Sequence, residues 1–75
     1  MEAKVNEIYK ALAGTNQQLG SMRNDLMDVL SACYKELVRA RLSDDNAAID
    51  ELSMLHEKIK SSLAVLQAAQ LILGA

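Results

Sequence analysis

The sequence predicts an all-α protein built as an antiparallel helical hairpin, and two observations lead to this prediction. The 75 residues include no proline and only 3 glycines, and most positions hold residues that favour helices. Apolar residues recur at helical spacing before and after one short polar segment, 43–46. Because so short a connection folds neighbouring helices back on each other, we expect the two flanking helices to pack antiparallel.

The first expected helix covers about residues 3–13. Its apolar stripe consists of Val5, Ile8, Tyr9 and Leu12. Gly14 interrupts this stripe, and the next four residues resemble a capping box, in which Thr15 begins a new helix and Gln18 reaches back to it. The pattern predicts a break between a short N-terminal helix, which would be a third helix of the fold, and a long helix over about 16–42.

The same residues also allow one continuous, bent helix. The heptad phase of the apolar stripe runs from Val5 to Cys33 straight through Gly14, and a glycine inside a helix costs only about 1 kcal/mol relative to alanine. The sequence favours the break, and the continuous helix is the alternative. The expected buried stripe of the long helix comprises Leu19, Met22, Leu26, Val29, Leu30, Cys33, Leu37 and Ala40.

The last expected helix runs from about residue 45 to residue 73. Residues 43–46 all favour N-cap positions, so the chain is expected to turn there, and Gly74 marks the C-terminal end of the helix. The main apolar stripe repeats every seven residues and comprises Leu52, Ile59, Leu66 and Leu73. Such a stripe is typical of a helix that packs along another helix.

The second half of this helix has more apolar surface than a hairpin needs. Val65 lies about 100° around the helix from Leu66, and Ile72 continues the line of Val65. A helix with so wide an apolar surface is expected to be buried on two sides. Either residues 3–13 fold back over the second side, or a separate chain covers it. The predicted partner-binding residues are Met54, Val65, Leu66, Ala69, Ile72 and Leu73.

Composition argues against other classes of function. Cys33 is the single cysteine and His56 the single histidine, so the chain lacks the ligands of a zinc site and an oriented catalytic pair. Cys33 is expected in the core and His56 at the edge of the stripe. The acids near the turn lack the spacing of a calcium loop. A net charge of -2 and two aromatic residues do not suit nucleic acid. We therefore expect no enzyme activity, no cofactor and no metal.

Neither a signal peptide nor a membrane span is predicted. No apolar segment follows the first four residues. The longest uncharged stretch, 61–75, contains four polar side chains and is shorter than the roughly twenty residues that a spanning helix needs. We expect a cytoplasmic chain that does not insert into a membrane.

Two segments of the expected hairpin carry a resemblance to a known family. Lys35-Glu36-Leu37 with Arg39 lies near the end of the long helix, and Leu63-Ala64-Val65-Leu66 lies in the last helix. With the small polar turn between them, they resemble the small E-type co-chaperones of bacterial type III secretion, over about residues 17–73. The resemblance implies a cytoplasmic bacterial protein without catalysis. Such a protein pairs with a tetratricopeptide-repeat chaperone and stabilises it, and the heterodimer keeps the needle subunit from polymerising before export.

The function expected from residues and resemblance together is that of a co-chaperone subunit, which docks on its partner with an apolar helix face. The rival interpretation is a homo-oligomeric coiled coil. Heptad positions 52, 59, 66 and 73 suit self-association, so the free chain is a candidate homo-oligomer.

Overall fold

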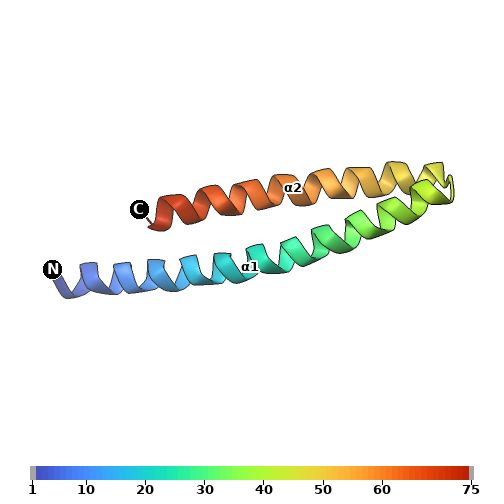
Figure 1. Cartoon of the computed structure of the whole chain (residues 1–75). Coiled ribbons are helices and arrows are strands. Elements are labelled where there is room, and N and C mark those ends of the chain that lie inside the picture. Colours follow the sequence, from blue (N-terminus) through green and yellow to red (C-terminus); the bar gives the residue numbers. More distant parts are fainter. Residues whose placement is uncertain (1, 75) are drawn as a thin grey trace.

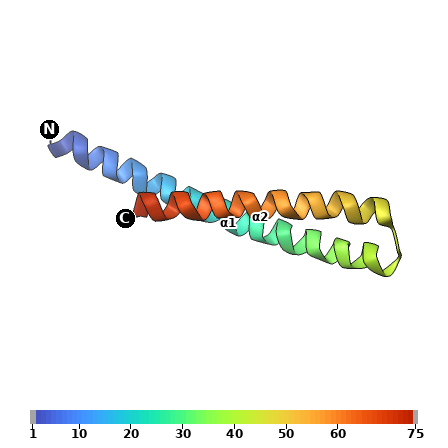
Figure 2. The same ribbon diagram turned by 90° about the horizontal axis from the view of Figure 1, so that it is seen from above.

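The computed structural model describes residues 2–74, and these form two helices. Helix α1 covers Glu2–Leu42 and helix α2 covers Asn46–Gly74. The helices lie side by side and antiparallel (Figure 1), and they cross at a shallow angle in the perpendicular view (Figure 2). The described part of the chain contains no strand, and the molecule measures 63 × 15 × 14 Å. The predicted all-α hairpin is confirmed.

Helix α1 continues through Gly14, so the predicted break between residues 13 and 16 is wrong. The Thr15 hydroxyl does not cap a new helix, because its Oγ1 donates a hydrogen bond to the carbonyl oxygen of Ala11, 3.0 Å away. Gly14 has no positive φ. A single glycine costs about 1 kcal/mol, which does not end a helix whose neighbours on both sides favour helix. The continuous helix, the alternative interpretation, is the observed one.

The first thirteen described residues of α1 extend beyond the end of α2. Helix α1 has 41 residues and α2 has 29. A Cβ atom added to Gly74 would lie 3.4 Å from Nδ2 of Asn16, so α2 ends at the level of Asn16. Residues 2–14, here named the overhang, project past that point (Figures 1 and 2), and every one of them is exposed. The overhang does not fold back over α2, so the expectation of a third helix as an intramolecular lid is wrong.

The two helices meet along positions with the alternating three-and-four spacing of a heptad repeat. We name this set of positions the seam. In α1 the seam consists of Asn16, Leu19, Arg23, Leu26, Leu30, Cys33, Leu37 and Ala40. In α2 it consists of Ile49, Leu52, His56, Ile59, Leu63, Leu66, Gln70 and Leu73. Only Cys33, Leu37 and Ala40 are buried among the described residues, and the other seam positions are half-buried.

The turn is built from two consecutive aspartates. Asp44 has φ 54° and its amide donates to Arg41, while the amide of Asp45 donates to the carbonyl oxygen of Ala40 at 3.0 Å. This pair of bonds is a Schellman motif, which satisfies the last carbonyls of α1. The Asp45 carboxylate then accepts a bond from the amide of Ala48 at 3.2 Å, so Asp45 is the N-cap of α2. The chain turns at residues 43–45, within the predicted segment 43–46, and Asn46 already belongs to α2.

Candidate partner-binding face

The two sides of the hairpin, left and right of the seam, differ in polarity. Residues seven apart lie on the same side of a helix, so the positions that flank the seam can be followed along each helix. On one side they are mainly apolar, and we name this side the apolar face. Its apolar members are Ile8, Met22 and Val29 from α1 and Leu55, Val65 and Ile72 from α2. All six side chains are exposed, and exposed apolar side chains on one side make that side a candidate interaction surface.

A groove lies on the apolar face in the half of the molecule next to the turn. We name it the turn groove. Both helices line it, with Val29, Ala32, Cys33 and Glu36 from α1 and Leu52, Leu55 and Ile59 from α2. Glu36 is the one charged residue of this lining, and its carboxylate pairs with the Arg39 guanidinium on the same helix. The floor of the groove is therefore apolar and its charged group sits at the rim.

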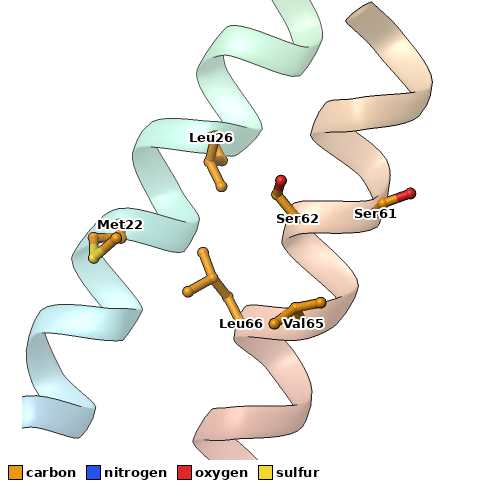
Figure 3. A pocket seen from close by; sticks show the side chains of 6 residues that line it. All are labelled: Met22, Leu26, Ser61, Ser62, Val65 and Leu66. Carbon is orange, nitrogen blue, oxygen red and sulfur yellow. The ribbon is translucent and has the colours of Figure 1, made fainter. Parts of the chain in front are cut away.

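A second groove, the middle groove, continues the same face toward the open end of the hairpin. It is lined by Met22, Leu26, Ser61, Ser62, Val65 and Leu66. Figure 3 shows Leu66 pointing from α2 into the space between the helices, where Leu26 approaches it from α1, while Ser61 points away. The apolar face thus forms a trough along the axis of the molecule, with two serines in its middle section.

The open end of the hairpin adds a third apolar contact region. There, Tyr9 and Leu12 of the overhang line a hollow together with Ile72 and Leu73 at the end of α2. Tyr9 is 69% exposed and Ile72 is 75% exposed. The stripe of the overhang therefore continues the apolar face beyond the last residue of α2.

The opposite side of the seam carries more polar side chains, although Met27 and Tyr34 of α1 also flank the seam there and are 52% and 54% exposed. The groove on that side is lined by Arg23, Gln67 and Gln70, with Leu71 as its one apolar residue. Lys60 and Arg41 flank the seam on this side. We name it the polar face. The grooves of the apolar face are lined mainly by aliphatic side chains of both helices, whereas the groove of the polar face is lined mainly by polar ones. The apolar face is therefore the better candidate for contact with an apolar partner surface.

The six predicted partner-binding residues do not all lie on the surface. Met54, Val65 and Ile72 are exposed, Val65 by 68% and Ile72 by 75%. Ala69 is half-buried beside the seam. Leu66 and Leu73 are half-buried seam residues that face α1, so most of their surface is used within the chain. Among the six, Val65 and Ile72 offer the largest apolar area on the apolar face.

Sequence reasoning missed the contribution of α1 to this face. Met22 and Val29 were expected in the buried stripe, yet Met22 is 52% exposed and Val29 is 50% exposed. The sequence itself indicated this surface. Helix α1 has two adjacent apolar stripes, one with Leu26 and Cys33 and the other with Met22 and Val29, and a single partner helix can cover only one of them. In the structure, α2 packs on the stripe that contains Leu26 and Cys33. The stripe that contains Met22 and Val29 therefore stays exposed.

The single thiol and the single imidazole lie at separate seam positions. Cys33 is buried, and its Sγ lies 3.5 Å from the carbonyl oxygen of Leu52, as expected for a core residue. His56 is half-buried in the seam, where its ring lies 6.4 Å from that of Tyr34 between centroids. It therefore belongs to the interface between the helices and not to the edge of the stripe. Within residues 2–74 no group of three or more His, Cys, Asp or Glu side chains is placed to hold a metal ion.

Neither α1 nor α2 combines the length and the apolar character needed to cross a membrane. The chain was compared with protein-family models, with curated proteins and with solved structures, and no match was found in any of the three comparisons.

Proposed function

We propose that this chain is a non-enzymatic co-chaperone subunit of bacterial type III secretion. In this proposal it binds a tetratricopeptide-repeat chaperone in the cytoplasm and stabilises it, and the pair keeps the needle subunit from polymerising before export. The observation that carries the proposal is the apolar face, where exposed aliphatic side chains of both helices form one trough. The family resemblance of the turn-flanking segments supports the choice of partner.

The shape of the molecule supports a helical partner. The hairpin is a rod with a cross-section of 15 × 14 Å, and repeat proteins built of stacked helix pairs present extended concave surfaces. A rod with one apolar side can lie along such a surface and bury that side, while its polar face stays in contact with water. The recognition mode is that of an amphipathic helical element in an apolar groove.

Because the core is small, binding of a partner is expected to raise the folding stability of the hairpin. Only three side chains of residues 2–74 are buried, and a chain of this size hides a modest share of its unfolded surface. A partner that binds only the folded hairpin stabilises it by mass action, and the chaperone gains stability in the same way. Each subunit would therefore be more stable in the complex than alone.

The rival interpretation, a homo-oligomeric coiled coil, rested on the heptad positions 52, 59, 66 and 73. These four residues lie in the seam and face α1 of the same chain. The stripe that suggested self-association is therefore used within the hairpin. Any further assembly therefore has to use a surface other than the seam, and the apolar face is the candidate that both helices line with aliphatic side chains.

The test is a pull-down of the tagged chain from the native bacterial cytosol, with the bound chains identified by mass. We expect a stoichiometric tetratricopeptide-repeat chaperone. The double variant Val65→Asp, Ile72→Asp should lose that chaperone and keep its helical circular dichroism, because both side chains are exposed. Recovery of the bait alone, at the mass of two or more chains, would contradict the co-chaperone proposal.

Leu71→Asp is the matched control for this experiment. Leu71 and Ile72 are neighbours in α2 with the same exposure, 75%, but Leu71 lines the groove of the polar face. Leu71→Asp should therefore retain the chaperone where Ile72→Asp loses it. Equal loss in the two variants would mean that the apolar face does not determine binding.

A further inference from the structure

We infer that the free chain forms an antiparallel dimer through the apolar face, in which the overhang of each copy occupies the turn groove of the other. The inference concerns the purified chain alone and does not depend on the proposed function. It identifies the occupant of the apolar face in the absence of another partner, and it specifies a register.

The first argument is that the chain cannot cover its own overhang. The overhang is the first part of one continuous helix, and α2 ends at the level of Asn16. Its four large apolar side chains, Val5, Ile8, Tyr9 and Leu12, are 37% to 69% exposed. The turn groove is equally unfilled, because no third helix lies over it. One molecule therefore presents both a free amphipathic helix and an apolar groove, and the rigid helix keeps the two apart.

The second argument is the match in register. Met22 is the middle residue of α1 and lines the apolar face. If a twofold axis passes beside Met22, two α1 helices align antiparallel over their whole length, and the numbers of facing residues add up to 44. Val29 and Glu36, which bound the turn groove along α1, then lie level with Thr15 and Ile8 of the second copy. Leu12 lies level with Ala32 of the groove lining, while Ile8 lies beside the Glu36 carboxylate at the rim. The apolar stripe of the overhang therefore lies over this groove.

The third argument is that the second chain supplies a helix where one is missing. In this arrangement the central section of the dimer contains four helices. Each end section contains the overhang of one copy and the turn halves of α1 and α2 of the other, which makes three helices. In the overhang, Leu12 lies on the heptad line of the seam and Ile8 on the neighbouring line of the apolar face. The apolar stripe of the overhang therefore faces the groove between those two helices.

The fourth argument is size. The molecule extends over 63 × 15 Å along its long side, which leaves room for a standard specific interface of about 800 Å² per partner. The antiparallel register uses this whole length, since the 41 residues of α1 at about 1.5 Å each span about 60 Å. A parallel arrangement would place the two overhangs together and leave both turn grooves empty.

The first part of the test is the mass of the purified chain by sedimentation equilibrium over a range of concentrations. We expect twice the chain mass of 8.2 kDa at high concentration, and the single-chain mass for Ile8→Asp, which leaves the hairpin intact because Ile8 is 60% exposed. A single-chain mass for the unaltered protein at all concentrations would overturn the inference. It would leave the pull-down result, and with it the proposed function, unaffected.

The second part is disulfide cross-linking in a Cys33→Ala background, which removes the native thiol. Met22→Cys should form a cross-linked dimer across the twofold axis. Met27→Cys is the matched control, because Met27 is also 52% exposed but lies on the other side of α1. A mixture of Ile8→Cys and Glu36→Cys should cross-link to each other. Cross-linking of Ile8→Cys to itself would show a parallel dimer, and preferential cross-linking of Met27→Cys would place the contact on the polar face; either result overturns the inference.

Discussion

The half of the hairpin next to the turn and the half at its open end are built from the same seam but differ in how well they bury it. The buried residues of the described part of the chain are Cys33, Leu37 and Ala40, and all three lie in the turn half. In the open half the seam includes Asn16, Arg23 and Gln70, which are half-buried. One polar atom of each has no hydrogen-bond partner within the described residues. The turn half is therefore a conventional apolar core, and the open half is not.

This difference indicates where the stability of the hairpin resides. Apolar seam residues near the turn gain from burial, and the tight turn keeps them together. Polar seam residues in the open half reduce stability but fix which residues face each other. We infer that the turn half holds the fold, while the open half and the overhang have little stability of their own and gain most from a binding partner.

The largest expected effect is that of Leu37→Ala in the turn half. Leu37 is 5% exposed, and truncating a buried leucine to alanine costs about 2–3 kcal/mol. The same change at Leu12 in the overhang, which is 37% exposed, should cost less than about 1 kcal/mol. Urea denaturation followed by circular dichroism measures both. Equal losses would mean that stability is spread evenly along the molecule.

The next effect tests the polar seam of the open half. Gln70→Leu replaces a half-buried amide, whose Oε1 lacks a partner within the described residues, by an apolar side chain, and should stabilise the hairpin by about 1.5 kcal/mol. Gln67→Leu is the control, because Gln67 is exposed and should change stability little. If Gln70→Leu lowered the stability of the hairpin, the Gln70 side-chain amide would have to make a stabilising interaction in the open half.

The same contrast explains what the sequence could and could not predict. The turn half was predicted well, because the polar, N-cap-forming residues 43–46 and the apolar stripe from Leu30 to Ala40 agree on one structure. The open half was predicted poorly, because Gly14 and Thr15 match a helix start that the longer-range pattern overrides. Heptad spacing identifies apolar lines but does not say which line a partner helix takes. That choice depends on packing between helices, which placed Met22 on the surface and His56 in the seam.

A smaller effect tests the turn itself. Asp45→Ala removes the carboxylate that accepts the amide of Ala48 and should cost about 1 kcal/mol. Asp45→Asn is the control, because asparagine caps about as well as aspartate, so it should stay near the unaltered stability. Both are measured by thermal unfolding. A loss in Asp45→Asn as large as that in Asp45→Ala would attribute the effect to charge at the start of α2 and not to the hydrogen bond.

The smallest expected effect compares two glycines of α1 on either side of the point where α2 ends. A Cβ atom at Gly14 would meet nothing within 4 Å, whereas one at Gly20 would lie 3.2 Å from Nε2 of Gln70. Gly14→Ala should stabilise α1 by about 0.5 kcal/mol, less than the full helix-propensity difference because residue 14 borders the overhang. In Gly20→Ala the same propensity gain is offset, since the Gln70 amide has to move.

Amide hydrogen exchange separates these two cases and sharpens the comparison between the halves. Gly14→Ala should slow exchange throughout the overhang, because it strengthens the link between the overhang and the paired part of α1. Gly20→Ala should leave the overhang unchanged. This response is expected where the chain is a single molecule. It should shrink at concentrations where the antiparallel dimer forms, because the second copy then holds the overhang. Dilution would then speed exchange there, as the antiparallel dimer requires.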